Sequence, residues 1–198
     1  MSYVTYAQVK AFKGDLDADK TLVESLIARA EGWLNRECRR TLVAESDTTR
    51  YADAAGDHLD GRYLEVSWLG DLCAVTTLVN GDGTTITSAQ YTTYPKPVTF
   101  EKPTIQRLKL LDSVNIFWTY TTDWENAIAI TGRWALFSSA SVPAEITNAV
   151  IRLALYLYKV KDTDAFETIV IPEAGIIQAP SGFPADVARL VRLFRKVG

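Results

Sequence analysis

The sequence predicts an α+β protein, in which a helical bundle made from the N- and C-terminal helices carries an inserted antiparallel β subdomain. Apolar residues recur at helical spacing near both ends of the chain, whereas short β-branched and aromatic runs fill the middle. Proline and glycine punctuate those middle runs. We expect residues 1–44 to form a helix pair and residues 45–137 the β subdomain. Residues 138–198 should hold a long helix, a flexible arm and a basic terminal helix that completes the bundle with 1–44.

Two helices are expected before the β subdomain. Thr5 is placed to cap a short helix over 6–12, and Gly14 with a run of aspartates ends it. A second helix should span 20–39, with Asp17 or Asp19 at its N-cap. Its apolar residues lie three and four apart and form one stripe: Leu22, Val23, Leu26, Ile27, Ala30, Trp33 and Leu34.

The pattern of the central region predicts many short strands. Asn80-Gly81-Asp82-Gly83 separates two of them and is a strong hairpin signal. Such short, frequently interrupted strands are typical of a small sandwich or barrel-like sheet. The runs with strand character are 49–52, 62–66, 74–79, 84–87, 90–94, 98–101, 105–109, 113–120 and 126–131.

The most informative segment is a helix over 143–161, which Pro143 starts. It is apolar almost all round, and its charged residues are Glu145, Arg152, Lys159 and Lys161. A helix with so little polar surface must be covered, either by its own domain or by copies of the chain. This pattern predicts an assembly component rather than a free enzyme.

The chain should end in an irregular arm over 162–182 and a last helix from Pro184 to about Lys196. The buried stripe of that helix is Val187, Leu190, Val191 and Phe194, and the opposite stripe is Arg189, Arg192 and Lys196. The basic stripe is either a solvated helix face or a docking surface for an acidic protein.

Composition excludes several classes of function. The 198 residues include 47% hydrophobic and 23% charged residues, as in globular proteins, and a net charge of −3 argues against binding of nucleic acid by phosphate neutralisation. Cys38 and Cys73 form no zinc motif, and we expect both to be buried free thiols and no cofactor to be bound. We expect no signal peptide and no membrane span, so a soluble protein made in a cytoplasm.

Two groups of residues are candidates for catalysis. His58, the single histidine, lies in a turn-like stretch without a serine in a nucleophile context, and is interpreted as a surface loop residue. Asp123-Trp124-Glu125 pairs two acids with an aromatic, as in glycoside hydrolases, but its place between strands favours a solvated loop. A carbohydrate-binding role for Trp118, Tyr120 and Trp124 stays open.

The order of parts resembles the head–tail connector proteins of tailed bacteriophages, also called neck adaptors. The similarity is carried at the N-terminus by the opening YVTYAQVK and the helix that ends at Arg40. It is carried near the C-terminus by ITGRW, VPAEI and GFPADV followed by a basic helix. The region 45–125 contributes little to the resemblance.

The resemblance implies a virion protein that forms a ring, usually dodecameric, below the portal. Such a ring extends the DNA channel without gripping the DNA and offers a platform for a stopper or tail-completion protein. Candidates for portal docking are Arg189, Arg192, Phe194, Arg195 and Lys196, and candidates for the contact between subunits are Ile146, Val150, Leu153, Leu157 and Tyr158. The alternatives are another neck or tail-completion ring, or a glycan-active protein using Asp123, Trp124 and Glu125.

Overall fold

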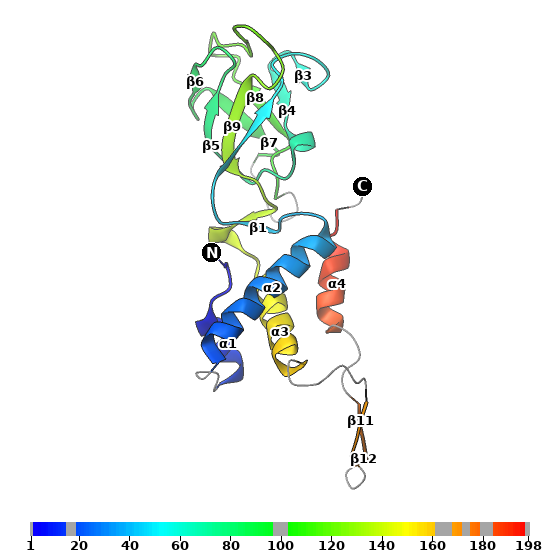
Figure 1. The fold of residues 1–198 in the computed structure, drawn as a ribbon. Helices are drawn as coiled ribbons and strands as arrows, with labels where there is room; N and C mark the ends of the chain where they lie inside the picture. The colour runs from blue at the N-terminus through cyan, green and yellow to red at the C-terminus, as the bar shows by residue number, and fades with distance from the viewer. Residues whose placement is uncertain are drawn as a thin grey trace. The chain divides into compact units, whose positions relative to one another are not determined.

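The computed structural model confirms the α+β class (Figure 1). It describes residues 2–14, 19–96, 103–160, 168–171, 175–178 and 184–196. The chain divides into two compact units, Met1–Arg39 with Val142–Gly198 and Arg40–Ser141, so the division lies at 39/40 and 141/142 rather than at 44/45 and 137/138.

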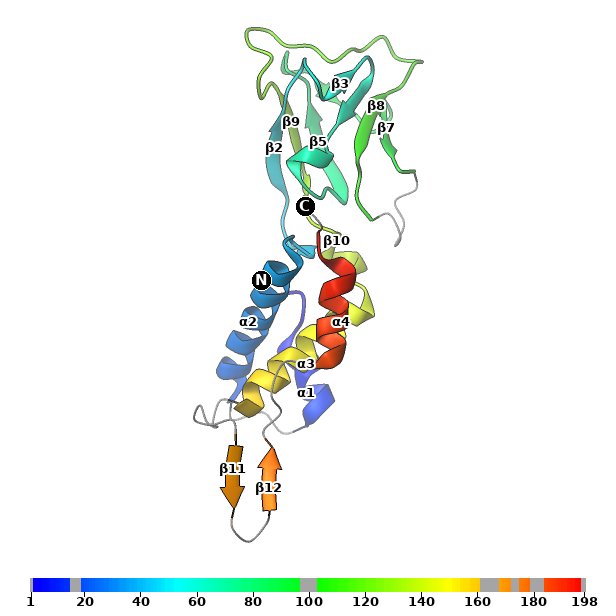
Figure 2. The ribbon, with the colours of Figure 1, turned by 90° about the vertical axis from the view of Figure 1, so that its right-hand side faces the viewer.

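The first unit is a helical bundle formed by the two ends of the chain (Figure 2). α2 lies against the other three helices. The reciprocal hydrogen bonds of a capping box begin α1: the Thr5 side chain accepts from the Gln8 amide, and the Gln8 side chain accepts from the Thr5 amide. The helices are α1 (Tyr6–Lys13), α2 (Lys20–Cys38), α3 (Ala144–Val160) and α4 (Ala185–Phe194).

The predicted arm contains regular structure. Strands β11 (Thr168–Ile171) and β12 (Gly175–Gln178) pair antiparallel, with Ile169 opposite Ile177. The prediction of an irregular segment over 162–182 is therefore wrong at these two strands. The runs TIVI and GIIQ are rich in β-branched residues, which was the available signal.

The second unit contains two four-stranded antiparallel sheets, in the orders β2-β9-β5-β6 and β3-β4-β8-β7. A separate parallel pair, β1 with β10, joins the beginning of the unit to its end. The strands are β1 (Val43–Ala44), β2 (Thr48–Ala52), β3 (Leu59–Asp60), β4 (Tyr63–Glu65), β5 (Ala74–Val79), β6 (Thr85–Ile86), β7 (Tyr91–Tyr94), β8 (Arg107–Leu110), β9 (Ile128–Arg133) and β10 (Phe137–Ser138).

Alternating burial along the strands builds the core of this unit. In β9, Ile128 and Ile130 are buried, while Ala129 between them and Thr131 after them are half-exposed. Leu64 of β4 pairs with Leu108 of β8, and both belong to the same buried cluster. Short 3₁₀ helices occur at Ser67–Leu69 and Ser139–Ser141.

The closing strand predicted over 113–120 does not form; Tyr120 makes one isolated bridge to Gly81. Side chains satisfy the carbonyl groups of this region instead. The Arg62 guanidinium donates to the Leu111, Val114 and Ile116 carbonyls at 2.8, 3.2 and 3.1 Å. The Asn80 amide donates to the Phe117 carbonyl at 2.8 Å. The run predicted over 98–101 lies outside the described residues.

Candidate functional site

The apolar surface of α3 is covered by the helical bundle itself. Ile146, Val150 and Leu153 are fully buried, and α3 packs against α2 and α4. They have no exposed surface to offer a sister subunit, so the prediction that these three residues form the contact between subunits is wrong. The sequence left two possible covers for α3, its own domain or copies of the chain, and in the structure its own domain covers it.

The other two residues proposed for that contact, Leu157 and Tyr158, are half-buried near the end of α3. The Tyr158 hydroxyl donates to the carboxylate of Asp19, the N-cap residue of α2, whose side chain makes no capping hydrogen bond to the helix. The Lys13 ammonium lies 4.1 Å from the centre of the Tyr158 ring. Tyr158 thus ties α3 to the end of α1 and the start of α2, while part of its surface stays exposed.

Helix α4 is fixed to the bundle by its inner face and near both ends. Val187, Leu190 and Val191 are buried. Near its start, Asp186 forms an ion pair with Arg152 of α3 at 2.7 Å. Just beyond its end, the Lys196 amide donates to the Cys38 carbonyl of α2 at 2.9 Å.

Of the residues predicted to dock on the portal, Arg189 and Arg192 lie on the other side of α4, Phe194 ends the helix, and Arg195 and Lys196 lie just past that end. Arg189, Arg192, Arg195 and Lys196 are exposed, and none of them forms an ion pair with another residue that the structure describes. Phe194 is half-buried.

Sequence reasoning missed Leu193, whose exposed fraction is 74%. It follows Arg189 by four residues, so these two side chains share one face of α4, whereas Lys196 lies beyond the end of the helix at Phe194. We call Arg189, Arg192 and Leu193 the outer face of α4. The signal in the sequence was this spacing, which places Leu193 off the buried stripe.

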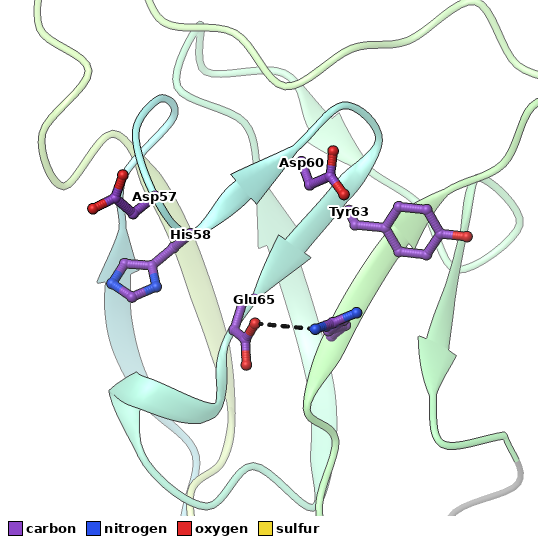
Figure 3. Close-up of a pocket in the computed structure, with 6 residues that line it drawn as sticks. Asp57, His58, Asp60, Tyr63 and Glu65 are labelled. Carbon is purple, nitrogen blue, oxygen red and sulfur yellow. Dashed lines mark ion pairs between the residues drawn. The ribbon is translucent and has the colours of Figure 1, made fainter.

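A hollow of about 220 Å³ lies beside the β3–β4 hairpin, and Figure 3 shows the side chains that line it. Glu65 pairs with Arg107 across adjacent strands, with 3.5 Å between Oε2 and Nη2. The His58 ring stacks on Trp68 with centroids 4.4 Å apart. The lining residues are Asp57, His58, Asp60, Tyr63, Glu65 and Arg107.

This arrangement does not assemble a catalytic set. Ser67 donates its hydroxyl proton to Glu65 at 2.8 Å, so this serine is not hydrogen-bonded to the histidine as a triad requires. Within the described ranges, no group of three or more His, Cys, Asp or Glu side chains is placed to hold a metal ion.

The Asp123-Trp124-Glu125 segment is an exposed turn. The Asp123 carboxylate accepts the Glu125 amide at 3.1 Å, and the Trp124 carbonyl accepts the Ala54 amide at 2.8 Å. The first bond closes the turn on itself, and the second holds it against the loop after β2. Trp118 is unavailable to a carbohydrate because it is only 7% exposed and donates its indole N–H to the Arg62 carbonyl at 3.0 Å.

No helix among the described residues is long and apolar enough to cross a membrane.

Comparison with known proteins finds similarity at the level of structure. No protein-family model and no curated protein matches the sequence. A chain in the neck of an empty GTA particle computed with C6 symmetry is 16% identical, with a TM-score of 0.53, over 97% of this chain and 89% of that chain. The two chains share a fold.

Two further solved structures are similar to a lesser degree. One is the neck of a native GTA particle computed with C12 symmetry, at a TM-score of 0.49 and 15% identity over 92% of this chain and 86% of that chain. The other is the virion of a native gene transfer agent (GTA) particle, at 0.48 and 18% over 94% and 82%.

Proposed function

We propose that this protein is a structural component of the neck of a phage-like particle. The observation that carries the proposal is the shared fold, which spans 97% of this chain and 89% of a GTA neck chain. Because the match includes both units, it reflects the order helix pair, β insertion, helix pair rather than one common motif. The proposal gives the chain a structural role and no catalytic one.

In this proposal the protein forms a homo-oligomeric ring below the portal. The GTA neck to which it is similar was computed with C6 symmetry, which fits a ring of six subunits or a multiple of six. The contact between subunits cannot use Ile146, Val150 or Leu153, because the bundle buries them. Leu157 and Tyr158 keep exposed surface and stay candidates.

The proposed ring has a partner on each side and DNA in its channel. A portal would contact the exposed cations of α4, and a stopper or tail-completion protein would attach on the opposite side. The net charge of −3 suits a channel that lets DNA pass without holding its phosphates.

The experiment that tests the proposal is cryo-electron microscopy of particles from the same genome, combined with binding of the purified protein to purified portal. We expect density for this chain directly below the portal, as a closed ring, and a stable complex with the portal in solution. Density at the far end of the tail, or infectious particles without this chain, would contradict the proposal. Density elsewhere in the neck would favour another neck ring.

A further inference from the structure

The outer face of α4 combines a large apolar side chain with cations. Leu193 is 74% exposed, the exposed Arg189 lies one turn before it on the same face of α4, and the exposed Arg192 is the residue next to it. A helix face that only needs to be solvated gains nothing from a leucine. An isolated exposed leucine is common, but here it lies beside two exposed arginines on a helix that is otherwise amphipathic.

The charge of this face is not neutralised within the described part of the chain. Asp186, the acid of α4, is occupied by Arg152 at 2.7 Å. No acid occurs from residue 189 to the end of the sequence. The face therefore matches a surface with acidic groups around an apolar depression.

The face is also held in place before any partner arrives. Val187, Leu190 and Val191 anchor the inner side of α4, and the Lys196 amide binds the Cys38 carbonyl at 2.9 Å. A fixed helix loses little conformational entropy when it docks, so its exposed side chains can contribute more to affinity.

We propose that Leu193 is the apolar anchor of this docking face, and that its occupant is a pocket ringed by carboxylates on the portal. The inference rests on the proposed function and adds to it a residue that sequence reasoning did not select. Leu193 fills the pocket and slows dissociation, whereas Arg189 and Arg192 attract the acidic rim and speed association. This division makes the two kinds of side chain separable by kinetics.

The test measures association and dissociation rates between the full-length protein and purified portal at several salt concentrations. We expect Leu193→Ala to weaken binding about 10- to 30-fold, mostly through faster dissociation. We expect Arg189→Gln with Arg192→Gln to slow association and to flatten its dependence on salt. The matched control is Phe12→Ala, which removes another exposed apolar side chain of the same unit, 61% exposed on α1, and should leave both rates unchanged.

Two results would overturn the inference while the proposed function stands. One is a portal complex that forms equally well with Leu193→Ala and with Phe12→Ala. The other is a loss of thermal stability in Leu193→Ala as large as in Leu190→Ala, which would make Leu193 a packing residue. If the unaltered protein does not bind portal at all, the proposed function fails first and this inference fails with it.

Discussion

Arg40 and Asp71 form a two-point ion pair at the start of the second unit. The Arg40 Nε lies 2.9 Å from Oδ2 of Asp71, and the Arg40 Nη2 lies 2.8 Å from Oδ1. The side chains are 19% and 13% exposed. Only arginine offers this parallel pair of donors to a carboxylate, so the contact fixes the first residue of the β unit in both distance and orientation.

Breaking this pair should destabilise the β unit. We expect Asp71→Asn to lower the free energy of unfolding by about 2 kcal/mol, because the half-buried guanidinium loses its charged partner. Urea denaturation checks this. The control is Lys109→Gln, whose partner Asp112 has a side chain 73% exposed, and which should change stability clearly less than Asp71→Asn does. Equal effects would mean that geometry and burial add nothing to the Arg40 pair.

The Asn80 side chain should act as a buried brace, by which we mean that its hydrogen bonds hold the segment 117–119 against the turn that contains Asn80. It is 2% exposed, donates to the Phe117 carbonyl, and accepts the Gly81 and Thr119 amides at 3.1 Å each. We expect Asn80→Ala to lower the free energy of unfolding by about 2–4 kcal/mol, since three backbone groups lose their partner. Chemical denaturation measures the change.

The comparison variant for the Asn80 experiment is Asp82→Ala, in the same turn. The Asp82 carboxylate accepts the Thr84 amide at 2.8 Å in an exposed position. Its replacement should cost clearly less than that of Asn80. A smaller effect at Asn80 than at Asp82 would contradict the brace.

Asp112 and Lys109 should show linked titrations. The hydrogen bond from Lys109, aided by its charge, lowers the pKa of Asp112 below the ordinary 3.8, and the same bond raises the pKa of Lys109 above 10.5. A lowered carboxyl pKa gives stability that is present above the unfolded pKa and is lost as pH falls through the folded one. A raised lysine pKa gives stability that is lost as pH rises through it.

Carbon-detected NMR titration of Asp112 checks this assignment. We expect its midpoint to move up towards 3.8 in Lys109→Gln. The carboxyl of Asp82, whose pKa is lowered mainly by the Thr84 amide, should keep its midpoint in that variant. An unchanged Asp112 midpoint would exclude the lysine as the cause.

Leu153 should behave as a core residue and not as an interface residue. It is fully buried between helices of the bundle, so Leu153→Ala should lower the free energy of unfolding of the isolated chain by about 2–5 kcal/mol. Arg152→Gln, at the exposed neighbouring position, should change stability by less than about 1 kcal/mol. Thermal and chemical denaturation of dilute monomer distinguish the two, and a Leu153→Ala monomer as stable as the unaltered chain would contradict the core role of Leu153.

Elements with local signals could be predicted from the sequence. The strand over 74–79 has the predicted bounds, because a β-branched run ends there at a turn. Thr5 and Gln8 lie three apart, as a capping box requires, and α1 begins there. In both cases the deciding contacts lie within a few residues of each other.

Features that depend on distant contacts could not be predicted. Arg62 donates hydrogen bonds to three carbonyls about fifty positions away. No sequence pattern near 113–120 indicates that bonds from a side chain take the place of strand pairing there. The apolar surface of α3 was recognised, but which partner covers it depends on how α2 and α4 pack. Leu193 could have been found, since its position relative to Arg189 follows from helix geometry alone.

The parallel pair between β1 and β10 places the point where the chain enters the β unit next to the point where it leaves, at about 5 Å, the spacing of neighbouring strands. A domain whose two ends lie side by side can be inserted, deleted or exchanged at one site, without changing the path of the flanking helices. The sequences of the helical bundle and of the β unit can therefore diverge at different rates. The bundle is constrained by assembly, and the β unit by the partners that it contacts.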